Sequence, residues 1–156
     1  MKKLFFCTML LFVVGLVQAQ SAGDIRLQLG GDYGFEIERF GINLGGEYVF
    51  LDKLSAAPNF TFYFPEDDVN ASNLNLDLRY YLTQDQLQFY GMAGFTTLWA
   101  SAKYMGVKVS ESNSGANFGV GSVIKFGGNL GLNPEVKYQT MGDGQVVVKV
   151  GLVYLL

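Results

Sequence analysis

The 156-residue sequence contains no histidine, one cysteine (Cys7) and few charged residues. Histidine is the side chain whose ordinary pKa lies nearest neutrality, so its absence removes the main agent of acid–base catalysis. Cys7 falls in a predicted leader, and neither a disulfide nor thiol chemistry is expected after processing. Charged residues make up 16% of the chain, whereas about a quarter is usual in soluble proteins. Either the surface is poor in charge or it does not face water.

Long apolar runs are also absent after the N-terminus, and a membrane-spanning helix needs about 20 such residues. The N-terminus itself has a shorter apolar run, Leu4 to Val17, which follows two lysines and precedes a small-residue cleavage sequence ending at Ala19. This pattern predicts a signal peptide over residues 1–19 and one mature domain over residues 20–156. The chain is therefore expected to be exported, and to enter a membrane only as a closed β-barrel.

Basic residues are scarce as well. Without the two lysines of the leader, nine Lys and Arg residues face 14 Asp and Glu residues, a net charge of −5. Nucleic-acid binding needs a basic patch, so no nucleic-acid partner is expected. The acidic cluster Glu66-Asp67-Asp68 and the serine-rich segment 101–115 are interpreted as solvated loops, and no metal site, cofactor or catalytic residue is predicted.

The sequence is rich in aromatic residues (15%), in glycine (20 residues) and in alternating apolar and polar positions. Alternation with a period of two residues indicates β-strands with one apolar face. Eight such segments occur, and short turns rich in Gly, Asn and Asp connect them: 24–33, 40–50, 59–64, 73–82, 87–100, 117–126, 132–139 and 145–156. Eight antiparallel strands in sequence order predict an all-β, up-and-down barrel.

Two strands need a further choice. In residues 87–100 the two faces are similar, and we place Phe89, Phe95 and Trp99 outward because the opposite choice would expose Gln88 instead. Pro58 cannot donate a hydrogen bond to a neighbouring strand. The third strand is therefore expected to begin late or with a bulge.

The same alternation would fit a soluble, lipocalin-like barrel with its apolar face inward. Three features favour a transmembrane barrel instead. Aromatic residues gather at strand ends, where lipid–water interfaces would lie. The longest links, 65–71 and 101–115, fall at one barrel end, as expected if both termini are periplasmic. The polar faces carry small neutral residues that suit a crowded lumen: Gly41, Asn43, Gly45, Asn73, Asn75, Asn117, Gly119, Gly121 and Asn133.

The last eight residues place Lys149, Gly151, Tyr154 and Leu156 at the spacing polar, x, Gly, x, x, aromatic, x, apolar. This resembles the C-terminal insertion signal of outer-membrane barrel proteins, although those usually end in Phe. By leader, strand count, alternation and terminal signal, the chain resembles the small eight-stranded barrels of the OmpA/OmpX-like superfamily.

The resemblance implies a monomer in the outer membrane of a Gram-negative bacterium. Its implied partners are outer-membrane lipid, lipopolysaccharide and the barrel-insertion machinery. Enzymes built on small outer-membrane barrels place a histidine in the active site. Because this chain has none, the resemblance predicts a protein that is not an enzyme.

Seven charged residues fall near the middle of the predicted inward faces: Arg26, Glu47, Asp77, Arg79, Glu135, Lys137 and Lys149. Buried charges are tolerated only when they are paired, so we expect an ion network whose cross-strand partners are Lys149 beside Glu135 or Arg26 beside Glu47. Such a network would plug the lumen, because eight strands leave no open channel. The predicted role is structural or an interaction at the surface. The alternative is a narrow channel or transporter for small hydrophobic or ionic solutes.

Overall fold

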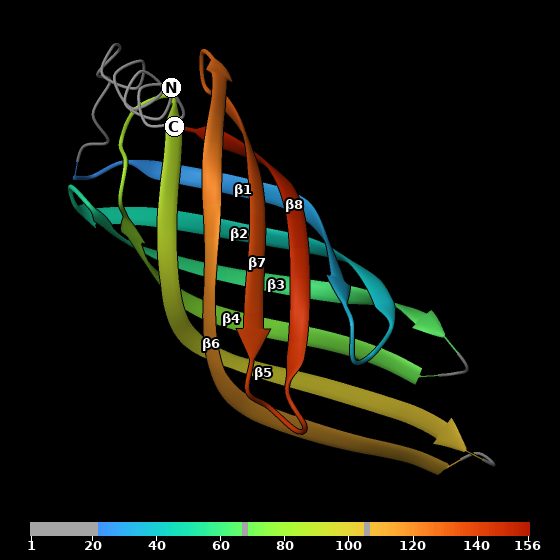
Figure 1. Ribbon diagram of the computed structural model, residues 1–156. Helices are drawn as coiled ribbons and strands as arrows, with labels where there is room; N and C mark the ends of the chain where they lie inside the picture. Colours follow the sequence, from blue (N-terminus) through green and yellow to red (C-terminus); the bar gives the residue numbers. More distant parts are fainter. Residues whose placement is uncertain (1–21, 67–68, 105–106) are drawn as a thin grey trace, which may run out of the picture.

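The computed structural model is a closed barrel of eight antiparallel strands in sequence order, as predicted (Figure 1). It describes residues 22–66, 69–104 and 107–156, so the predicted signal peptide lies outside the described residues. The strands are β1 (Ile25–Gly34), β2 (Arg39–Leu51), β3 (Leu54–Glu66), β4 (Val69–Tyr81), β5 (Leu87–Tyr104), β6 (Val107–Gly127), β7 (Leu130–Gln139) and β8 (Gln145–Leu155). In the described part of the chain, no helix has the length and apolarity to cross a membrane.

Strand β8 closes the barrel by pairing with β1 from Leu155 opposite Arg26 to Val147 opposite Gly34. Two glycines allow this close approach. Gly30 and Gly151 face each other across the seam, and a Cβ atom on Gly30 would lie 2.7 Å from the Cα atom of Gly151. The closing strand thus leaves β1 without a free edge along its length.

Strands β5 and β6, which form one hairpin, are longer than the sequence pattern predicts. Strand β5 continues to Tyr104 and β6 begins at Val107, so residues 101–104 and 107–115 of the predicted loop lie in two paired strands. This hairpin extends beyond the β7–β8 turn, at the barrel end opposite the C-terminus (Figure 1). The prediction was wrong because residues 110–114 (Ser-Glu-Ser-Asn-Ser) are polar at every position, so the alternation disappears there while the backbone pairing continues.

A similar correction applies to β3. Residues 65–71 are not one loop, because β3 reaches Glu66 and β4 begins at Val69. At its other end β3 begins at Leu54, and Pro58 lies inside the strand. Pairing between β2 and β3 passes from Tyr48–Ala56 directly to Gly45–Asn59. Pro58 is thus accommodated by an interrupted ladder, and the register irregularity lies nearer the turn, between Val49 and Leu51.

The outer wall of the barrel is apolar and the interior is polar. Leu29 and Leu152 are each 54% exposed on the outer wall, whereas Arg79 and Asn75 are completely buried inside. Strand β5 follows the predicted parity: Phe89, Phe95 and Trp99 are exposed while Gln88 and Tyr90 are buried. Thr97 is the exception on the outward face, being only 9% exposed. The polarity is the reverse of that in a soluble barrel.

Candidate functional site

The candidate site is a layer of buried charge across the middle of the lumen. All seven charged residues named from the sequence lie there, each with 2% or less of its surface exposed, and Asp32 joins them. Four positive and four negative side chains therefore balance. A buried charge is strongly unfavourable without a partner, so this balance is what makes the layer compatible with a folded barrel.

Arg79 on β4 is the centre of this layer. Its Nη1 atom lies 3.0 Å from Oε2 of Glu47, and its Nη2 atom lies 2.8 Å from Oε2 of Glu135. The guanidinium group presents its donors in a fixed planar fork, which lets one side chain hold two carboxylates at once. Because β2, β4 and β7 are not neighbours in the sheet, these contacts cross the lumen.

Glu47 has a complete set of partners besides Arg79. Its Oε1 atom accepts hydrogen bonds from the hydroxyl groups of Ser55 at 2.5 Å and Tyr81 at 2.6 Å. Gln28 donates to the other carboxylate oxygen at 3.1 Å. Arg26 lies 3.7 Å away as an ion pair and donates at 3.0 Å to the Tyr81 hydroxyl oxygen. The Glu47 carboxylate is therefore saturated and is not available as a general base.

Glu135 forms the second centre of the layer. Lys149 lies 3.1 Å from its Oε1 atom, and the Tyr90 hydroxyl donates to its Oε2 atom at 2.7 Å. Lys137 lies 3.7 Å from the same carboxylate and 3.8 Å from Asp77. Lys149 also faces Glu135 directly in the β7–β8 register, which explains why strand parity alone pointed to this pair.

Asp32 is a site residue that the sequence reasoning missed. It accepts hydrogen bonds from Thr61 at 2.6 Å and Asn43 at 3.3 Å, and it pairs with Lys149 in the β1–β8 register. The available signal was its even spacing from Arg26 along β1, which puts both side chains on the inward face.

A layer of amides joins the charges. Asn75 receives hydrogen bonds at its Oδ1 atom from Asn117 at 2.9 Å and Gln139 at 2.8 Å, and donates to Asn59 at 3.0 Å. Asn59 and Asn117 in turn donate to the Asp77 carboxylate at 3.1 and 2.8 Å. The sequence identified Asn75 and Asn117 as small and neutral, but their contribution is a continuous hydrogen-bond network.

Two buried tyrosine rings pack against the charged layer. Tyr81 and Tyr90 form a buried cluster with Met92 and Val123, and the two rings lie 5.3 Å apart. The guanidinium of Arg79 lies 4.6 Å from the centre of the Tyr90 ring. A cation over an aromatic face gains attraction, so the tyrosines contribute packing as well as hydroxyl donors.

The chemistry open to this layer is limited. Its carboxylates face cations and hydroxyl donors within the protein, and in the described residues no group of three or more His, Cys, Asp or Glu side chains is arranged to hold a metal ion. The four residues of the predicted insertion signal divide between two places. Lys149 and Gly151 are buried on the inward face, while Tyr154 and Leu156 are exposed on the outer wall.

An eight-stranded barrel with an apolar outer wall and a charged, hydrogen-bonded interior is a transmembrane β-barrel of the outer-membrane type. The chain belongs to the family described as outer membrane protein beta-barrel domain, whose model matches residues 9–154. A comparison with curated protein sequences found no match.

Solved structures of three bacterial barrels share the fold. The N-terminal β-barrel domain of Pseudomonas aeruginosa OprF has a TM-score of 0.73 at 20% identity, over 88% of this chain and 100% of that one. The Yersinia pestis attachment invasion locus protein Ail has a TM-score of 0.64 at 17% identity, over 86% and 99%. Neisserial surface protein A has a TM-score of 0.66 at 16% identity, over 86% and 97%. At these identities the likeness establishes the fold alone.

Proposed function

We propose that the chain is an integral outer-membrane protein with a plugged interior and a structural or surface-interacting role. The observation that carries the proposal is the Arg79 bridge, which joins Glu47 and Glu135 across the lumen at 3.0 and 2.8 Å. Opening a continuous path past it would separate buried opposite charges, and that is costly in a low-dielectric interior. The tyrosine cluster and the amide network fill the space on either side of the bridge.

The plug predicts an impermeable barrel. Purified protein in liposomes should give no swelling with small sugars and no steady conductance in planar bilayers, because eight strands leave a lumen that side chains fill. A porin incorporated into the same vesicles provides the positive control. Passage of sugars through the barrel would contradict the proposal.

A narrow ion path is the second candidate function. Some lumen atoms lack a hydrogen-bond partner within the described residues, including Nε of Arg26, Nε of Arg79 and Nζ of Lys137. Buried polar atoms of this kind often hold water, and a chain of waters could carry ions. Steady conductance without sugar passage would favour this candidate over the plug.

We also propose that both termini face the periplasm and that the β5–β6 hairpin faces the exterior. The hairpin is the longest in the barrel, with strands of 18 and 21 residues, and outer-membrane barrels have longer extracellular than periplasmic connections. The proposed partners are outer-membrane lipid, lipopolysaccharide and the barrel-insertion machinery. The barrel is also proposed to be a monomer. We propose no catalytic activity, because the buried carboxylates are paired with cations.

Cysteine labelling tests this orientation, since Cys7 is the only natural cysteine and lies in the predicted signal peptide. Two exposed positions receive a cysteine. Asn113→Cys places it on β6, in the β5–β6 hairpin, and Lys53→Cys places it in the β2–β3 turn. A membrane-impermeant maleimide added to intact cells should label the first variant and not the second. Breaking the outer membrane should make Lys53→Cys reactive. Labelling of Lys53→Cys alone on intact cells would reverse the orientation.

A further inference from the structure

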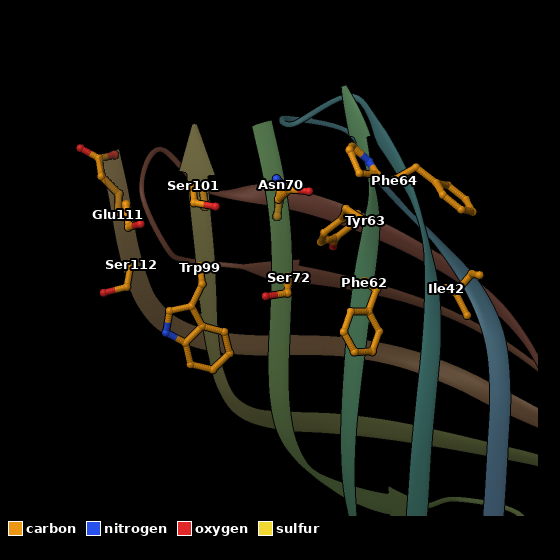
Figure 2. Close-up of a pocket in the computed structure, with 14 residues that line it drawn as sticks. Ile42, Phe62, Tyr63, Phe64, Asn70, Ser72, Trp99, Ser101, Glu111 and Ser112 are labelled. Atoms are coloured by element: carbon orange, nitrogen blue, oxygen red, sulfur yellow. The ribbon is translucent and has the colours of Figure 1, made fainter. Parts of the chain in front are cut away.

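The outer wall carries a groove of about 720 Å³ that crosses β2 to β6, toward the far end of the β5–β6 hairpin. Its centre is a single row of paired residues: Phe62 faces Ser72, Ser72 faces Trp99, and Trp99 faces Ser112. Paired side chains on one face of a sheet lie about 5 Å apart. The small Ser72 therefore leaves a slot between two aromatic rings, as Figure 2 shows.

The two rings are held in place yet remain accessible. Phe60 lies 4.5 Å from Phe62 and 6.3 Å from Trp99, measured between ring centroids, and it is nearly parallel to Trp99. Trp99 remains 41% exposed and Phe62 56% exposed. The slot thus has two supported aromatic walls with surface free for a ligand.

The polar groups of the slot are also free. Within the described part of the chain, the side chains of Ser72, Ser112 and Asn70 make no hydrogen bond to another residue. Along β4 the outward positions change from Leu76 to Leu74, then Ser72 and Asn70. The slot therefore lies where the apolar belt ends, which is the depth of lipid headgroups in an outer-membrane barrel.

The charge of the residues that line the groove favours one kind of lipid headgroup. Among the residues whose side chains the structure describes, the lining includes one carboxylate, Glu111, and neither Lys nor Arg. Phosphate groups are normally bound by Arg or Lys, so an anionic phospholipid headgroup is a poor match. A neutral sugar is a good match, because its hydroxyls can bond to serine and asparagine while its C–H face packs on the electron-rich face of an aromatic ring. The volume also falls within the usual range of about 300–1,000 Å³ for small-molecule sites.

We infer that the slot between Phe62 and Trp99 binds the neutral sugar headgroup of a membrane glycolipid. The occupant is anchored in the membrane because the slot opens sideways on the outer wall. The inference rests on the proposed function for its outer-leaflet location. It does not depend on whether the lumen conducts, since the slot residues lie on the opposite face of the sheet from the Arg79 bridge.

Trp99 is the only tryptophan of the chain, so its fluorescence reports directly on the slot. The folded barrel in phosphatidylcholine nanodiscs is titrated with monoglucosyldiacylglycerol, and a saturable change in Trp99 emission is expected. Phosphatidylglycerol and unglycosylated diacylglycerol should give no saturable change. Soluble methyl glucoside should also give none in the same range; an equal response to it would overturn the membrane-anchored source.

Two variants complete the test. Ser72→Leu fills the slot without adding charge to the wall and should raise the half-saturating glycolipid concentration about tenfold or more. Phe40→Leu removes an exposed ring on β2 outside the groove lining and should leave binding unchanged. Unaltered binding by Ser72→Leu, or an equal response to phosphatidylglycerol, would overturn the inference. Heat-modifiable mobility verifies folding of each variant, and the permeability and labelling assays judge the proposed function separately.

Discussion

Replacing Arg79 with methionine is expected to lower the free energy of unfolding by about 3–5 kcal/mol, the usual cost of removing one partner from a buried ion pair. The substitution removes a guanidinium group that contacts Glu47 at 3.0 Å and Glu135 at 2.8 Å. Both carboxylates would remain in the lumen with less compensation. Urea unfolding of the barrel in lipid vesicles, followed by gel mobility, measures the change.

Two further variants make the Arg79 result specific. Lys53→Met removes an exposed charge from the β2–β3 turn and should change stability by no more than about 0.5 kcal/mol. Combining Arg79→Met with Glu135→Gln should recover part of the loss, because one uncompensated carboxylate becomes neutral. Wild-type stability of Arg79→Met, or strictly additive losses in the double variant, would show that the bridge contributes little.

Strand number, topology and facing were predictable from the sequence because a membrane constrains them so strongly. A lipid-facing position must be apolar and its neighbours along the strand must face inward, so a period of two residues survives in the sequence. The alternation therefore predicts that Arg26 and Lys149 point inward, and the structure buries both. Where strands leave the apolar belt, as in residues 101–115, this constraint ends and the prediction failed.

The pairing of charges was predictable only between neighbouring strands. Lys149 and Glu135 face each other across β7 and β8, so parity and strand order suffice to identify them. Arg79 reaches Glu135 across the lumen from β4 to β7, and this contact depends on barrel diameter, tilt and side-chain length together. Alternation alone does not specify these quantities.

The outer groove was hidden for a related reason. Phe62, Ser72 and Trp99 are separated in the sequence but become one row through the registers of β3, β4 and β5. A serine at one outward position is unremarkable by itself. Its placement between two rings follows from the strand registers. A register can be derived from the sequence only when the length of the link between two strands is predicted correctly. The predicted links 65–71 and 101–115 were both too long.

Placing aspartate at both Tyr154 and Leu156 is expected to abolish the assembled barrel in the outer membrane. Tyr154 is 46% exposed on the outer face of β8, the strand that closes the barrel against β1. The substitutions remove the aromatic and apolar positions of the predicted insertion signal and put two charges on the lipid-facing wall. Outer-membrane fractions examined for heat-modifiable mobility should contain no folded protein.

A charge control separates the insertion signal from the cost of aspartate in lipid. Tyr138→Asp puts the same group on the exposed face of the neighbouring strand β7, where a carboxylate costs less than the roughly 2–4 kcal/mol of a basic residue at the bilayer midplane. That variant should still assemble, with reduced stability. Leu156→Phe, which provides the usual terminal residue of such signals, should assemble at least as well as the natural chain. If the double aspartate variant reached the outer membrane folded, β8 would act only as the closing strand, and its last residues would not be an insertion signal.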